Sequence, residues 1–177
     1  MITPVPPPIG DTLHPYGFGM YIWHVRGETV VGHTGQIPGF ASVAIYLPSQ
    51  DVTIVALGND DNFDAQNFGR RLAAIALGRP YQPIRDVTVP PADLISIPGQ
   101  YRQGAEVRTF FANEGKLYSQ RPGRAPLPLQ MTANGELHFD PDELSYFLPV
   151  KDASGSVIRL DYFDHGDGPP KALLRIH

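Results

Sequence analysis

Short runs of apolar residues dominate the first third of the chain, and their spacing is typical of β-strands. Turn-forming residues at 26–28 and 48–51 separate neighbouring runs. Connections this short join antiparallel strands, because a parallel crossover needs a dozen or more residues. The run at 52–57 is apolar on both faces, which predicts a strand covered on both sides. The expected strands are 18–26, 29–33, 41–47 and 52–57.

A helix is predicted directly after these strands. Asn and Asp residues at 59–62 offer helix N-caps, and a stripe of apolar residues at i, i+4, i+7 and i+8 follows them. A glycine at 78 and a proline at 80 end the pattern. We therefore expect an amphipathic helix at 64–77, packed on the four-stranded sheet through this stripe. The stripe consists of Phe68, Leu72, Ile75 and Ala76.

The rest of the chain has the pattern of a linker and a second, all-β unit. Residues 79–97 are rich in proline and have no periodicity, so we expect a semi-rigid linker. Eight short β-type runs at nearly regular spacing follow, which predicts a small up-and-down barrel at 98–177. The strands are expected at 99–103, 107–112, 116–120, 127–132, 136–139, 144–150, 157–163 and 172–177. The expected interior consists of Phe110, Leu117, Leu129, Leu137, Phe139, Phe147, Ile158, Leu160 and Leu174.

Composition narrows the function classes. The 177-residue chain has a formal net charge of −4 and no cluster of Lys and Arg, which argues against binding to nucleic acid or to an anionic membrane surface. It contains no cysteine, so disulfides, thiolate metal sites and a Cys nucleophile are excluded. The six histidines lack metal-ligand spacing, and we expect neither a metal nor a cofactor. No apolar run approaches the roughly 18 residues of a membrane span, and residues 1–8 lack the pattern of a signal peptide.

Four short motifs in residues 16–59 follow one another in an informative order. They are Tyr16-Gly-Phe-Gly19, Gly32-His-Thr-Gly-Gln-Ile-Pro-Gly-Phe40, Tyr46-Leu-Pro48 and the apolar strand that ends at Asn59. This order resembles the end of the catalytic domain in serine β-lactamase-like proteins. That superfamily includes class C β-lactamases, D-alanyl-D-alanine carboxypeptidases, D-aminopeptidases and related esterases. The resemblance covers roughly residues 1–78 and implies an α+β fold for them, an antiparallel sheet with one packed C-terminal helix.

The resemblance implies part of a catalytic site. In this family a Ser-x-x-Lys, a Tyr-x-Asn and a Lys-Thr-Gly or His-x-Gly motif build the site together. His33-Thr34-Gly35 matches the third motif, whose strand edges the cleft. The resemblance implies that His33 and Thr34 face the substrate, that Gly35 permits its close approach, and that the backbone N–H of Gln36 points at the oxyanion. The alternative is that His33 is an ordinary histidine on a strand, without a role in a site.

The first two motifs of the family are absent from this sequence. No serine is followed by Lys at the third position, and no tyrosine by Asn or Ser at the second. Nucleophile and general base are therefore both missing, and we expect the chain alone to be inactive. It looks like the C-terminal part of a longer serine hydrolase that cleaves amide or ester bonds. Members of this superfamily are generally exported, which implies a periplasmic or secreted parent.

The barrel region has a resemblance of its own. Pro98-Gly-Gln-Tyr101, Gly115-Lys-Leu117 and Leu137-His-Phe139 resemble the lipocalin-like barrel appended to many proteins of this superfamily, where it packs on the catalytic domain or aids assembly. An alternative function is a stand-alone binding module whose barrel holds a small apolar ligand. We also expect a homo-oligomer, or pairing with a missing catalytic half, because the sheet would otherwise expose apolar residues. The residues expected to be exposed are Ile22, Val43, Ile45 and Ile54.

Overall fold

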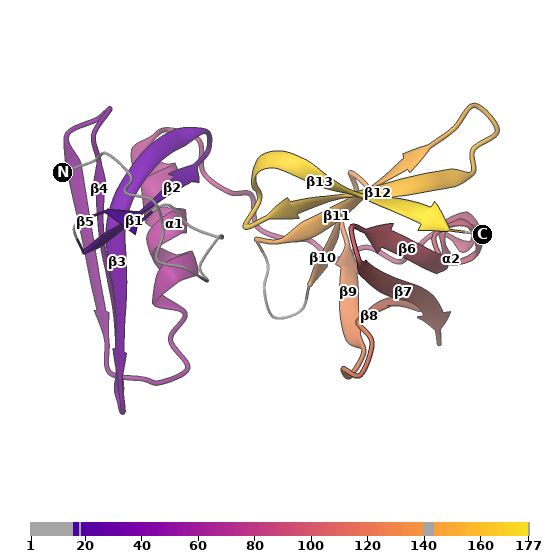
Figure 1. Ribbon diagram of the computed structural model, residues 1–177, viewed down its shortest axis with the longest axis horizontal. Coiled ribbons are helices and arrows are strands. Elements are labelled where there is room, and N and C mark those ends of the chain that lie inside the picture. The colour runs from indigo at the N-terminus through magenta and orange to yellow at the C-terminus, as the bar shows by residue number, and fades with distance from the viewer. Residues whose placement is uncertain (1–15, 18, 140–143, 177) are drawn as a thin grey trace. The chain divides into compact units, whose positions relative to one another are not determined.

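The computed structural model describes residues 16–17, 19–139 and 144–176. The chain divides into two compact units, one ending at Gln82 and one beginning at Pro83. The described residues are mostly β: a five-stranded antiparallel sheet lies in the first unit and a closed eight-stranded barrel in the second, with one short helix in each (Figure 1). The predicted barrel is therefore confirmed, and the described part of the chain has less helix than an α+β fold implies.

The first unit is a sheet whose strands pair in chain order. Its turns explain the tight connections. Arg26 and Gly27 both have positive φ, as a two-residue hairpin turn between β2 and β3 requires. Pro38 and Gly39 join β3 to β4, with Gly39 at φ 86°. The strands are β1 (Tyr16–Gly17), β2 (Met20–Val25), β3 (Glu28–Ile37), β4 (Phe40–Leu47) and β5 (Val52–Gly58).

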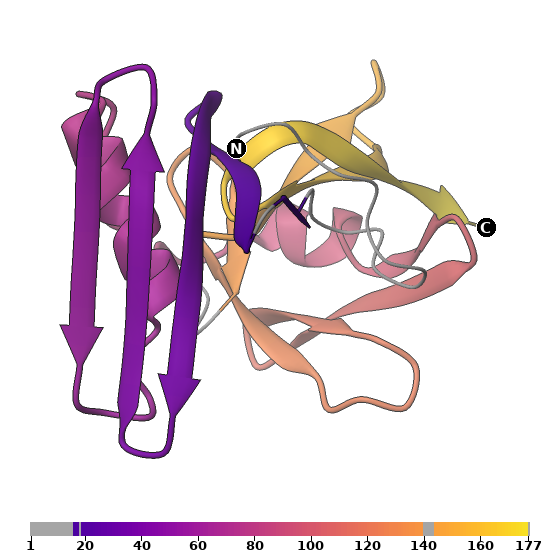
Figure 2. The same cartoon turned by 60° about the vertical axis from the view of Figure 1, so that its left-hand side comes forward.

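One helix, α1 (Ala65–Ala76), lies against one face of β4 and β5 (Figure 2). The Asp64 carboxylate caps it by accepting the Asn67 N–H at 3.0 Å. The helix starts and ends one residue inside the predicted range, but the predicted stripe is wrong, since Phe68 and Ile75 are exposed. The small residues of α1 face the sheet instead, because its bulky Val and Ile side chains leave no room for larger ones. The buried positions are Ala65, Gly69, Arg70, Ala73 and Ala74.

The exposed apolar residues of the sheet also differ from the expectation. Val43 and Ile45 are buried beneath α1, and Ile22 is buried as well. In β5 the side chains alternate: Val55 and Leu57 are exposed, whereas Ile54 is half-buried. The prediction that both faces of this strand are covered is therefore wrong. Val55 and Leu57 lie on the sheet face opposite α1, and Leu57 is 81 % exposed. This face of the unit is therefore partly apolar.

The second unit begins with a segment that packs on the barrel. Within the expected linker, the Val87 N–H donates to the carbonyl of Met131, and Val89 is buried in the barrel core. A short helix, α2 (Pro91–Ser96), then leads to the fully buried Ile97. Proline at its first position fits a helix start, where the missing N–H has no partner to lose.

The barrel closes through antiparallel pairs in the order β10-β11-β12-β13-β6-β7-β8-β9. Seven of the nine expected interior residues are buried. Ile158 and Leu174 are exposed, and their neighbours Val157 and Leu173 are buried instead. The pairing shifts by one residue near the start of β12, and such a bulge breaks the simple alternation of faces. The strands are β6 (Gly99–Gln103), β7 (Glu106–Asn113), β8 (Lys116–Gln120), β9 (Leu127–Met131), β10 (Leu137–Phe139), β11 (Tyr146–Lys151), β12 (Val157–Asp164) and β13 (Asp167–Ile176).

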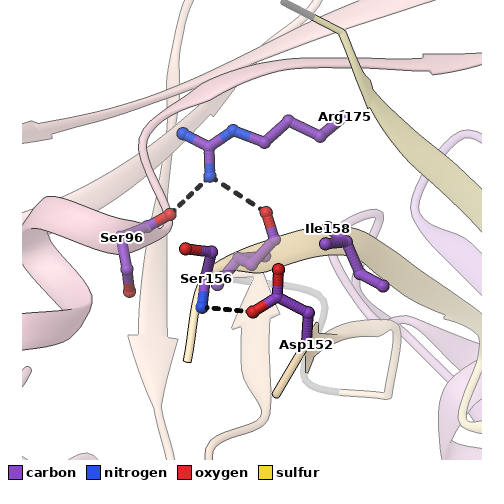
Figure 3. Close-up of a pocket in the computed structure, with 6 residues that line it drawn as sticks. Ser96, Asp152, Ser156, Ile158 and Arg175 are labelled. Carbon is purple, nitrogen blue, oxygen red and sulfur yellow. Dashed lines mark hydrogen bonds between the residues drawn. The ribbon is translucent and has the colours of Figure 1, made fainter. Parts of the chain in front are cut away.

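Arg175 fastens one end of the barrel. Its guanidinium donates to the backbone carbonyls of Ser96 at 2.7 Å, Pro98 at 2.6 Å and Val157 at 3.1 Å. Figure 3 shows this group beside Ser96. Ser96 and Arg175 line a pocket of about 470 Å³. Hydrogen bonds from a charged donor are stronger than neutral ones. One side chain therefore ties the end of α2, the residue before β6 and the start of β12 to the last strand.

We predict that Arg175→Met destabilises the barrel and not the sheet. The substitution leaves three backbone carbonyls without their donor, so the free energy of unfolding should fall by about 3 kcal/mol. Urea unfolding followed by circular dichroism measures this change. Trp23, the only tryptophan, lies in the sheet core, so its fluorescence should unfold at an unchanged midpoint. The exposed Arg102→Met is the control; an equal loss there would contradict the role of Arg175.

Candidate functional site

Strand β3 extends beyond its neighbour β2, and this leaves one edge of it open. Residues 28–32 of β3 pair with β2, whereas residues 31–37 pair with β4. Within the described residues, the segment 33–37 therefore has a partner strand on one side only. This segment contains all four candidate residues, His33, Thr34, Gly35 and Gln36.

The two hairpin turns that flank β3 fix which backbone groups face the open edge. The residues next to a two-residue turn form a hydrogen-bonded pair, and such pairs alternate along an antiparallel ladder. The turn at Pro38-Gly39 directs the odd-numbered residues toward β4, and the turn at Arg26-Gly27 independently directs the even-numbered ones toward β2. The N–H and C=O groups of Thr34 and Gln36 consequently face the open edge.

Side-chain hydrogen bonds agree with this assignment. The carbonyl of Gly35 accepts from the Ser42 hydroxyl on β4 at 3.4 Å, so it faces β4. The carbonyl of Thr34 accepts from Nδ1 of His33. This bond places the proton of neutral His33 on Nδ1 and leaves the lone pair of Nε2 as an acceptor. The His33 ring is exposed and lies 5.1 Å from the Tyr21 ring and 6.2 Å from the Tyr16 ring.

The end of β3 borders a polar hollow of about 310 Å³ at the start of α1. Its lining includes Thr34, Gln36, Asp61 and Asn62. The Gln36 side-chain amide donates to the Asp61 carbonyl at 3.2 Å, and the Asp61 carboxylate accepts the Gly39 N–H at 2.6 Å. The loop before α1 thereby holds the β3–β4 turn in place beside the open edge.

Two glycines permit the close packing of this strand. A Cβ at Gly32 would lie 2.3 Å from the Ala44 carbonyl oxygen and 2.9 Å from the Trp23 ring. A Cβ at Gly35 would meet only the Ser42 hydroxyl, at 2.8 Å. Backbone cannot move aside as a hydroxyl can, so Gly32 is required for the fold itself. The close neighbour of Gly35 is the Ser42 hydroxyl, which can move aside.

The structure thus brings the four predicted residues onto one open strand edge, while their roles toward a substrate stay predictions. Sequence reasoning missed Ser42 and Asp61, which hold the strand and its turn; no motif marks either residue. Among the described residues no cluster of three or more His, Cys, Asp or Glu could hold a metal. None of the helices in the described ranges is long and apolar enough to cross a membrane.

Comparison with known proteins gives a distant relationship. No protein-family model matches the chain. A D-aminopeptidase of Gluconobacter oxydans is 33 % identical over 78 residues, which are 44 % of this chain and 15 % of that protein. The chain therefore spans only a small part of this curated relative. The match shows a distant similarity to this D-aminopeptidase and extends over less than half of the chain.

Two solved structures are similar at a low level. One is a crystal structure of SurE with D-Leu, with a TM-score of 0.44 and 18 % identity over 99 % of this chain and 42 % of that one. The other is the octameric penicillin-binding protein homologue from Pyrococcus abyssi, with a TM-score of 0.38 and 19 % identity over 90 % and 37 %. Both TM-scores are below 0.5, so neither likeness establishes a common fold.

We predict that the two glycines differ in how they tolerate a methyl group. Gly32→Ala should lower the free energy of unfolding by about 2–3 kcal/mol, because the added carbon meets a backbone carbonyl. Gly35→Ala should cost about 1 kcal/mol or less, and the Ser42→Ala substitution should remove that cost by deleting the hydroxyl it meets. Urea unfolding followed by Trp23 fluorescence measures the three single variants and the two double variants that combine Ser42→Ala with each glycine substitution. If Ser42→Ala also rescues Gly32→Ala, the close contact is misassigned.

Proposed function

We propose that this chain supplies the substrate-binding edge of a serine hydrolase of the β-lactamase-like class, which cleaves amide or ester bonds. The observation that carries the proposal is the open edge of β3, which the backbone groups of Thr34 and Gln36 face and where the Thr34 carbonyl bonds to the His33 ring. The sequence match to a D-aminopeptidase supports the same class of reaction. Residues 1–78 would then be the C-terminal segment of the catalytic domain, joined through 79–97 to the barrel at 98–177.

The open edge offers a substrate the hydrogen bonds of an additional strand. An extended peptide or an acyl chain that lies along β3 would bond to the N–H and C=O groups of Thr34 and Gln36. Its scissile carbonyl oxygen would lie against the Gln36 N–H, which would stabilise the negative charge that forms on that oxygen during attack. A donor fixed in a strand needs no reorganisation at that moment, which is why it favours the transition state.

His33 would bind a second polar group, which belongs either to the substrate or to the residues that transfer protons. Because its Nδ1 hydrogen is donated to the Thr34 carbonyl, the lone pair of Nε2 would be the acceptor that His33 offers to a substrate. It would hold the substrate or the proton-transfer groups in position, in place of the lysine of Lys-Thr-Gly. Gly35 has no side chain to obstruct the approach of a substrate to this edge.

The nucleophile would come from elsewhere, because this chain has no Ser-x-x-Lys and no Tyr-x-Asn. We propose that a catalytic half covers the sheet face opposite α1, where Val55 and Leu57 are exposed. An exposed apolar surface of this kind is usual at a subunit or domain contact. Self-association of the chain would cover the same residues in the absence of such a half.

We predict that His33 is needed for catalysis and not for folding. In a chimera, residues 16–78 of this chain replace the corresponding segment of a D-aminopeptidase such as that of Gluconobacter oxydans, and hydrolysis of a D-alanine p-nitroanilide is measured. His33→Ala should lower kcat/KM of the chimera by roughly 10–1000-fold, the range for loss of one positioned polar group. Its melting temperature should stay nearly constant, because the exposed ring supports little packing.

The matched control is His24→Ala, since His24 is an exposed histidine on the neighbouring strand β2 and lies away from the open edge. It should leave both activity and melting temperature unchanged. The isolated chain, assayed in parallel, should show background hydrolysis and no labelling by a serine-reactive phosphonate. If His33→Ala keeps full turnover and lowers the melting temperature by several degrees, His33 is structural and the proposed site is wrong.

A further inference from the structure

The barrel interior contains a buried arginine whose charge is only partly compensated. Arg108 lies on β7 opposite Tyr101 of β6, and both side chains are buried. The next inward residue of β7, Phe110, is 1 % exposed, and the Arg108 side chain itself is 8 % exposed. Arginine is almost never buried to this extent without a partner, because desolvation of its charge is costly.

The carboxylate beside Arg108 is a weak partner. Nη2 of Arg108 lies 3.4 Å from Oε1 of Glu106, while Nε of Arg121 lies only 2.9 Å from the same oxygen. Glu106 is about half exposed, so water screens its charge further. The Nε–H of Arg108 has no hydrogen-bond partner among the described residues. A buried donor without an acceptor is unusual in a folded protein.

A second arginine of the same barrel shows how such a group is normally satisfied. Arg175 donates to three backbone carbonyls and lies 3.5 Å from the Tyr101 hydroxyl, so the fold itself supplies its acceptors. Arg108 instead faces aromatic rings. Its guanidinium carbon lies 5.2 Å from the centre of the Phe147 ring, 5.9 Å from Phe139 and 6.0 Å from Tyr162. Rings stabilise the cation but do not accept its in-plane hydrogen bonds as an oxygen would.

We propose that the barrel interior at Arg108 is a binding site for a small monocarboxylate with an apolar body. The carboxylate would bond to Nε and one Nη of the guanidinium, the two-point geometry that arginine offers to planar anions. The apolar body would pack against Phe139, Phe147 and Tyr162. Because Nε of Arg108 and the Phe147 ring are fully buried, the ligand would have to enter where Tyr162 is only half-buried, and this ring would have to move aside.

The surroundings select the charge and size of the ligand. Glu106 already places a negative charge beside Arg108, which disfavours a dianion such as a phosphate monoester. An eight-stranded barrel leaves space for one small ligand at most. Burial lowers the pKa of the Arg108 guanidinium, and the nearby Arg121 lowers it further, against the opposing effect of Glu106. A bound anion would therefore relieve an unfavourable charge.

The test uses the full chain with benzoate as the probe and benzamide as its neutral counterpart. Nuclear magnetic resonance follows the Nε–H signal of Arg108, assigned by its loss in Arg108→Lys, and calorimetry measures affinity. Benzoate should shift this signal and bind at least ~10-fold more tightly than benzamide, since hydrogen bonds to charged groups contribute strongly. Arg108→Met should abolish that preference, whereas Arg108→Lys should retain part of it.

The matched control is Arg121→Met, which removes the exposed arginine that shares Glu106. It should change benzoate affinity by less than about threefold, because exposed ion pairs contribute little. Equal affinity for benzoate and benzamide would overturn the proposal. Unchanged benzoate binding by Arg108→Met would also overturn it. So would an unshifted Arg108 signal at 10 mM ligand, a concentration that corresponds to roughly the weakest specific binding. If Arg108→Met fails to fold, the wild-type signal and Arg108→Lys decide alone.

Discussion

The register of the β3–β4 hairpin determines everything that the first unit presents to a ligand. The Pro38-Gly39 turn pairs Ile37 with Phe40, and every later pair follows from this one. A slip by one residue would exchange the two faces of the sheet. It would move Val43 and Ile45 away from α1 and direct the Thr34 and Gln36 backbone toward β4. The Asp61 carboxylate, bonded to the Gly39 N–H, stabilises the turn that prevents this.

Much of this arrangement could be predicted from the sequence, because motifs mark turns and strands directly. The position of the His-Thr-Gly segment on a strand follows from its neighbours. The open edge does not, since it depends on how far β2 extends. β2 has 6 residues and β3 has 10, and nothing in the local sequence marks this difference. The prediction of which face of α1 is buried was wrong for a similar reason, since the space at the sheet surface has no local signal in the helix sequence. Apolar Phe68 and Ile75 suggested a contact, but the sheet accommodates only the smaller Ala73 and Gly69.

The barrel shows the same limit of sequence reasoning. Its strand number follows from evenly spaced turns, and most inward residues follow from alternation. The shift of pairing near Ile158 cannot be predicted, because one extra residue in a strand leaves the composition unchanged. Arg108 and Arg175 look alike in the sequence. Only the fold distinguishes them, by supplying backbone carbonyls to one and aromatic rings to the other.

The central claim, that Thr34 and Gln36 offer an open backbone edge beside His33, can be tested by native-state hydrogen exchange of single amides. In the isolated chain the N–H groups of Thr34 and Gln36 should exchange quickly, because they face the open edge. Those of His33, Gly35 and Ile37 should be protected by their bonds to β4. The contradictory result is uniform protection of all five amides, or protection of the even-numbered residues alone.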